Sequence, residues 1–235
     1  MKKILFSLVA LMCSMSMNAQ DMKVMKNGEV VATFSGSKYK FVFEKAAITG
    51  TAKRTGDIDV NWVQLWKDGP KFAEYNVGVT DGKAESYGEY YAWGGTTNQS
   101  DSDSNNDDDV LTGDSDTATK LWGSNWRMPT VDELYVLETS CTRQWTTVNG
   151  VNGWKITGKD AYASNSVFLP AAGKYIKTPF RDGVFDQGSL GCYWSSVPNT
   201  DFGGARYLYL SETERSGVFD NSRGVGKSVR AVLAE

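Results

Sequence analysis

The residues with the clearest capacity for chemistry are the acidic side chains of the polar stretch 96–109. They recur at short spacing together with one amide, as Asp101, Asp103, Asn105, Asp107, Asp108 and Asp109. Oxygen donors that alternate in this way can bind calcium. An EF-hand loop, however, needs glycine at its sixth position and a carboxylate at its twelfth, where this stretch has Asn106 and Thr112. We therefore interpret the stretch as a solvated loop and predict no metal site and no cofactor.

The amino-acid composition excludes several common kinds of catalytic site. The chain contains no histidine, which excludes a Ser-His-Asp site, a Cys-His site and histidine-ligated zinc. A carboxylate pair, as in a glycosidase, stays open because acidic residues are plentiful. We predict no catalytic residue and expect a protein that is not an enzyme.

The first nineteen residues are typical of a secretion signal. Lys2 and Lys3 precede an apolar run over 4–12, and Met17-Asn18-Ala19 offers a cleavage point before Gln20. The apolar run is too short to span a bilayer, and no later segment is apolar enough to do so. We expect an exported protein that is periplasmic, displayed on the cell surface or secreted.

Two of the three cysteines remain after the leader is removed. Cys13 lies in the leader and would carry a lipid in the alternative of a lipoprotein, although Met12 fits a lipobox poorly. Cys141 and Cys192 either form a disulfide or are two separate buried thiols. Such a disulfide would close a loop of about 50 residues, worth ~4 kcal/mol in the chain-entropy description.

The candidate recognition residues follow an aromatic strand near the C-terminus. Trp194, with Ser195 and Ser196, could stack on a sugar ring, but a core tryptophan is the favoured interpretation. Polar groups beside an exposed aromatic at the ends of strands suit recognition, and here they are Asn199, Asp201, Phe202, Arg206, Asp220, Asn221 and Arg223. Arg230 lies in an apolar strand and is predicted to be a structural ion-pair partner.

A helix over 131–140 is the best-defined element that would position these residues. Pro129 prevents a helix from running through it, Thr130 is a good N-cap, and Glu133 completes a capping box. Its buried face is predicted to be Val131, Leu134 and Tyr135, continued by the stem of Glu138. The preceding Trp126 and Arg127 are interpreted as a core aromatic and a satisfied structural arginine.

The remaining elements are mostly strands. Asn27-Gly28 and Asn149-Gly150 favour type I′ hairpins, the first between 22–26 and 29–34 and the second between 145–148 and 151–157. A short helix is predicted over 116–122 with Asp116 as its cap. Further strands are predicted at 38–44, 60–77, 166–169, 192–195, 205–210, 217–220 and 228–233. The fold class is therefore α+β, with one or two short helices and many antiparallel strands.

The domain organisation follows from these elements. We predict a signal peptide at 1–19, an N-terminal β element at 20–45, a linker at 46–58 and one domain at 59–235. Removing Lys2 and Lys3 from the 25 basic residues leaves 23 against 28 acidic ones, a net charge of −5. This acidic balance argues against a nucleic-acid partner.

Eight short motifs occur in an order that resembles one protein family. They are Asn76-Val77-Gly78, Tyr87 to Gly94, Trp122-Gly123, Trp126 to Thr130 with Glu133-Leu134, Trp145 to Val151, Val167 to Gly173, Gly191 to Ser196, and Ser228 to Val232. This order resembles the Fibrobacter succinogenes major paralogous domain family, whose members are exported Bacteroidetes proteins with a C-type-lectin-like fold. Cys192 and the acidic stretch 101–116 depart from its pattern.

The resemblance implies a scaffold that presents ligands on long loops and on its C-terminal strands. We therefore expect a non-catalytic binding or adhesion module that recognises a glycan or a protein on a surface. The alternatives are a structural subunit of a fimbria or surface layer, a carbohydrate-active enzyme, and a binding protein diversified near its C-terminus by a retroelement. The calcium-dependent sugar triplets of animal lectins are absent, because Val197-Pro198-Asn199 lacks the acidic residue.

Overall fold

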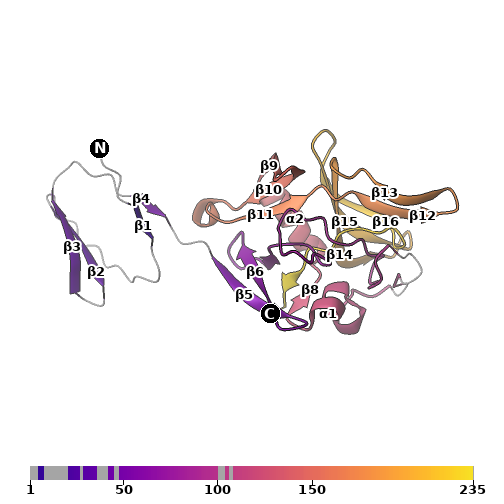
Figure 1. Ribbon diagram of the computed structural model, residues 1–235, viewed down its shortest axis with the longest axis horizontal. Helices are drawn as coiled ribbons and strands as arrows, with labels where there is room; N and C mark the ends of the chain where they lie inside the picture. The colour runs from indigo at the N-terminus through magenta and orange to yellow at the C-terminus, as the bar shows by residue number, and fades with distance from the viewer. Residues whose placement is uncertain are drawn as a thin grey trace. The chain divides into compact units, whose positions relative to one another are not determined.

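The computed structural model divides the chain into two compact units, Met1–Ala47 and Ile48–Glu235. It describes residues 5–7, 21–26, 29–35 and 42–44 in the first unit, and 48–99, 104–105 and 108–234 in the second. Most of the predicted leader, with its cleavage point, lies outside the described residues. The described residues of the second unit form mainly antiparallel sheets together with two α-helices (Figure 1), so the predicted α+β class is confirmed at this level.

The described residues of the first unit form four strands in two pairs. β2 (Asp21–Lys26) and β3 (Glu29–Ser35) are antiparallel with Lys26 opposite Glu29, as the hairpin prediction required. Asn27-Gly28 itself lies outside the described residues. The predicted third strand over 38–44 is described only as β4 (Val42–Glu44), which pairs in parallel with β1 (Leu5–Ser7) and not with the hairpin.

A five-stranded sheet joins both ends of the second unit. Its order is β5 (Thr49–Arg54), β6 (Ile58–Gln64), β7 (Lys71–Ala73), β17 (Val232–Leu233) and β8 (Trp126–Arg127). The C-terminal strand thus lies between β7 and β8. The predicted linker 46–58 is wrong where β5 forms, because this polar segment is an edge strand whose residues alternate between exposed and half-buried.

Both predicted helices form where their caps require. In α1 (Thr117–Trp122), Asp116 is the N-cap and accepts from the Thr119 amide at 3.0 Å. In α2 (Val131–Ser140), the Thr130 hydroxyl accepts from the Glu133 amide at 3.2 Å, and the Glu133 carboxylate accepts from the Thr130 amide at 2.7 Å. The capping box is therefore complete.

The residues around α2 confirm one expectation and correct another. Trp126 is fully buried, and Arg127 donates to both carboxylate oxygens of Glu133, at 2.6 and 2.8 Å. The predicted buried face is wrong at Tyr135, whose side chain is 58% exposed. Leu134 is buried as predicted, and Leu137 takes the place of Tyr135, because the helix turns its i, i+3 stripe toward β14 and β15.

Replacing Thr130 with alanine is expected to lower the free energy of unfolding by about 1 kcal/mol. The substitution leaves the Glu133 amide without its capping acceptor while the Arg127–Glu133 ion pair can persist. Urea unfolding followed by circular dichroism measures the change. Thr139→Ala, at an exposed site late in the same helix, is the control and should change the unfolding free energy by less than the cap variant does.

Three further sheets carry the rest of the second unit. β9 (Thr142–Val148), β10 (Val151–Thr157) and β11 (Ser166–Pro170) form one, and the turn residues Asn149 and Gly150 have φ of 47° and 85°, as a type I′ turn requires. β12 (Lys174–Thr178) and β13 (Arg181–Phe185) form a hairpin that the sequence pattern did not predict. β14 (Leu190–Asn199), β15 (Gly204–Ser211) and β16 (Gly217–Ser222) form the third.

Two hydrophobic clusters lie on opposite faces of β14 and β15. Cys192, Trp194 and Tyr207 belong to the first, whereas Tyr193 and Leu208 belong to the second. Trp194 is fully buried, so its interpretation as a core residue is confirmed. Cys141 packs in the second cluster, and both it and Cys192 are free thiols. Of the two alternatives for the cysteines, the structure has the separate buried thiols.

Arg230 is structural, although not through the ion pair that was predicted. Its buried guanidinium donates to four neutral acceptors, at 2.7–3.0 Å: the Asn76 side-chain oxygen and the carbonyls of Ala73, Glu74 and Phe168. It thereby ties the β7 segment to β11. In the described part of the chain, no helix is long and apolar enough to cross a membrane.

Candidate functional site

The predicted recognition residues gather at one end of the β14–β15–β16 sheet. Asn199 is opposite Gly204, and Arg206 is opposite Asp220 in the strand register. Asp201 and Phe202 lie in the connection between β14 and β15. The sheet thus brings residues from two strand connections to the same edge, as the sequence pattern suggested.

The residues at this edge do not all face the same way. Neighbouring residues of a strand point to opposite faces of the sheet, so the side chains of Asp220 and Asn221 lie on opposite faces. Asp220 forms an ion pair with Arg206 at 3.2 Å, whereas the Asn221 side chain hydrogen-bonds to that of Tyr207. The seven predicted residues therefore lie along the same edge of the sheet but do not form a single concave site.

Two of the predicted ligand residues are structural. Arg223 is only 4% exposed, lies 4.8 Å from the Trp93 ring centre and donates to the Gly204 carbonyl at 2.9 Å and to Asp108 at 2.6 Å. Asn199 is also buried, and its side-chain oxygen accepts from the Asp201 amide at 3.1 Å. Both side chains hold the loops in place and are not available to a ligand at the surface.

Phe202 is the most prominent of the predicted residues. Its side chain is 82% exposed, and Asp201 beside it is exposed as well. A phenyl ring in water costs free energy unless a partner covers it. The accessible chemistry at this edge is therefore one aromatic ring, one carboxylate and the nearby Arg206–Asp220 pair.

The acidic loop is only partly described. Asp101, Asp103 and Asp107 lie outside the described residues, while Asp108 is the ion-pair partner of Arg223 and Asp109 is exposed. Asn105 donates its backbone amide to the Trp93 carbonyl at 2.7 Å. Among the residues that the structure describes, no three acidic or cysteine side chains are placed to hold a metal ion.

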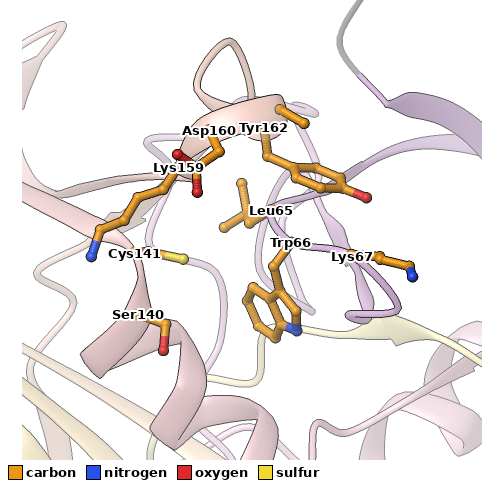
Figure 2. Close-up of a pocket in the computed structure, with 9 residues that line it drawn as sticks. Leu65, Trp66, Lys67, Ser140, Cys141, Lys159, Asp160 and Tyr162 are labelled. Carbon is orange, nitrogen blue, oxygen red and sulfur yellow. The ribbon is translucent and has the colours of Figure 1, made fainter.

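A cavity of about 380 Å³ lies away from the predicted edge. Three segments form it: the connection after β6, the C-terminal end of α2, and the 3-10 helix η2 (Asp160–Tyr162) with the residue before it. Figure 2 shows Leu65 at its centre between the rings of Trp66 and Tyr162, with the Cys141 sulfur and the Lys159 and Asp160 side chains beside it. Sequence reasoning missed this cavity because its residues are far apart in the chain and form no motif.

The thiol in this cavity is unreactive near neutral pH. Burial raises the pKa of the Cys141 thiol to about 11, and the charge of Lys159 opposes this only in part. The reactive form of cysteine is the thiolate. Cys141 therefore acts as a small apolar wall group and not as a nucleophile.

A buried amine packs against the aromatic rings of the first hydrophobic cluster. Lys227 is fully buried, and its Nζ has no hydrogen-bond partner among the described residues. The Nζ lies 3.8 Å from the centre of a Trp194 ring and 4.5 Å from that of Tyr207. Burial lowers the pKa of this amine to about 7.

Comparisons of this chain with protein-family models, with curated proteins and with solved structures gave no match.

Proposed function

We propose that the protein is an exported, non-catalytic binding or adhesion module with a C-type-lectin-like fold, and that the β14–β15–β16 edge is its recognition surface. The supporting observation is Phe202, an aromatic side chain left 82% exposed on a loop that two well-packed strands hold. A rigid scaffold with a protruding aromatic and nearby charged groups suits recognition of a surface glycan or protein, because the ring is already placed before binding.

The motif order of the Fibrobacter succinogenes major paralogous domain family supports the same proposal. Its aromatic and glycine motifs fall on the core and turns of the second unit, for example Trp126 at 0% exposure and Gly173 at φ 74°. Such a frame leaves the loop ends free to differ without disturbing the core. The ligand would then be set by Asp201, Phe202 and the Arg206–Asp220 pair.

Replacing Phe202 with serine is expected to abolish binding to the ligand that a glycan array or a pull-down from host and bacterial surface extracts identifies. A buried aromatic anchor at an interface is typically worth about 2 kcal/mol or more, which corresponds to a loss of at least about thirtyfold in affinity. Phe180→Ser is the matched control, because Phe180 is 95% exposed on a different connection, between β12 and β13.

If the folded wild-type protein binds nothing on the glycan array and nothing in the pull-down, the result would count against the binding function. Equal binding by the two serine variants and the wild type would instead place recognition elsewhere on the molecule.

A structural subunit is the second candidate, and the separate N-terminal unit Met1–Ala47 favours it. In that case, the strand pair β2–β3 would serve assembly. Surface display that persists after deletion of 22–44 would remove the reason for this alternative.

A further inference from the structure

The cavity next to α2 has the walls of a site for a small ring. Leu65 is 1% exposed and forms the floor, while Trp66 and Tyr162 are half-buried aromatic side chains on either side of it (Figure 2). The volume of about 380 Å³ lies within the range of small-molecule sites. A flat or branched apolar group could fill this space and contact both rings. The cavity shares no residue with the Phe202 edge.

The rim of this cavity carries one positive and one negative side chain from consecutive residues. Figure 2 shows Lys159 and Asp160 leaving the same edge of the cavity. Neither side chain forms an ion pair or a side-chain hydrogen bond within the described part of the chain. Lys67, the other cation at the rim, already has Asp68 as its neighbour at 3.9 Å.

The backbone at the rim supports this arrangement. Asp160 has φ of 50°, a left-handed conformation that is uncommon outside glycine and that aspartate and asparagine tolerate best. Gly158 precedes it, and a Cβ there would lie 2.3 Å from the Leu65 carbonyl oxygen and 2.6 Å from Tyr162 Cβ. The loop is thus packed closely against Leu65, and this packing fixes the backbone positions from which the side chains of residues 159 and 160 extend.

We propose that this cavity binds a free amino acid with an aromatic or branched apolar side chain. The apolar side chain would lie on Leu65 between Trp66 and Tyr162. The carboxylate would pair with Lys159 and the ammonium with Asp160. A ligand with a single charge would leave one of the two rim groups unpaired.

Three probes that share a phenyl ring separate these contributions. Isothermal titration of the full chain should give the tightest binding for L-phenylalanine, and binding about fivefold weaker for phenylacetate, which lacks the ammonium, and for phenethylamine, which lacks the carboxylate. Methyl glucoside, a neutral ring of similar size, should give no binding. Weaker binding of L-phenylalanine than of either single-charge probe would overturn the zwitterion assignment, and tighter binding of methyl glucoside would overturn the ligand class.

Two substitutions test the role of each rim charge. In Lys159→Met the preference for L-phenylalanine over phenethylamine should disappear, and in Asp160→Asn the preference over phenylacetate should disappear. Lys155→Met and Asp109→Asn remove equivalent charges from exposed residues outside the cavity and should leave all affinities unchanged. If both rim variants retain the wild-type preferences, the assignment of the rim charges is wrong.

The cavity cysteine reports occupancy without any substitution. Slow alkylation of Cys141 at pH 8.5, measured at the peptide level by mass spectrometry, should be reduced severalfold by saturating L-phenylalanine. Cys192 is 1% exposed in the other cluster and serves as an internal reference whose rate should not change. Binding by calorimetry that leaves the Cys141 rate unchanged would place the ligand outside this cavity. Neither result depends on Phe202, so the cavity and the proposed recognition edge can fail separately.

Discussion

Replacing Lys227 with methionine is expected to raise the free energy of unfolding at pH 7 by about 2–4 kcal/mol. The amine is fully buried without a hydrogen-bond partner among the described residues, and burial lowers its pKa from 10.5 to about 7. At pH 7, where the folded amine is half protonated, a shift of this size corresponds to a cost of about 4 kcal/mol for holding the amine in the folded state. Attraction to the Trp194 and Tyr207 rings offsets about 2 kcal/mol of it. Methionine has a similar shape and no such cost.

The same lysine predicts how stability depends on pH. The folded amine releases its proton near pH 7 and the unfolded amine near pH 10.5, so the unfolded state binds more protons between these values. The free energy of unfolding should therefore rise by about 1 kcal/mol per pH unit between pH 7 and 8.5. No histidine titrates in this window. Above it, the buried thiols act in the opposite direction, because burial raises the pKa of both Cys141 and Cys192 to about 11.

Urea unfolding at half-unit steps from pH 6.5 to 8.5 measures this slope. Lys227→Met should flatten the profile, whereas Lys155→Met, at an exposed site on β10, should keep the wild-type slope. A wild-type profile that is flat over this range, or a methionine variant that is less stable than wild type at pH 7, would contradict the prediction.

The same substitution at Arg230 is expected to have the opposite sign. Arg230→Met should lower the free energy of unfolding by about 3–5 kcal/mol, because it leaves three backbone carbonyls and the Asn76 oxygen without their donor. Burial lowers the pKa of Arg230 only to about 10, so the group stays charged at neutral pH. Its partners and not its charge state distinguish it from Lys227.

Urea unfolding of the two methionine variants under one set of conditions makes the comparison direct. If Arg230→Met is too unstable to purify, the soluble yield and the unfolding midpoint of Arg230→Lys replace it, since lysine has fewer donors and should give an intermediate loss. Wild-type stability in either Arg230 variant would show that the four hydrogen bonds contribute little.

The local elements could be predicted because their signals lie within a few residues. Thr130 with Glu133, Asp116, and Asn149-Gly150 each determine a cap or a turn without reference to the rest of the chain. The strand over Thr49–Arg54 could not be predicted in this way, because it depends on pairing with β6 and not on its own composition. The prediction that Tyr135 is buried was wrong for a related reason, since the strands that α2 packs against determine which face of the helix is buried.

The site was less predictable than the fold. Arg206 and Asp220 could be expected near each other once two adjacent strands were assumed, and the structure pairs them at 3.2 Å. The burial of Arg223 could not, because Trp93 and Asp108, its partners, are more than a hundred residues away in the sequence. The cavity around Leu65 likewise depends on three separate segments meeting, which no local pattern encodes.

The alternation of β14 and β15 between two hydrophobic clusters has a consequence for folding. Trp194 and Tyr207 face one cluster while Tyr193 and Leu208 face the other, so a slip of one residue in this strand pair would exchange the two sets. Both clusters pack on the same two strands, so unfolding of one cluster removes the cover from one face of β14 and β15 and weakens the strands that carry the other cluster. The second unit should therefore unfold in one cooperative transition, and amide protons on β14 and β15 should exchange only through that global event.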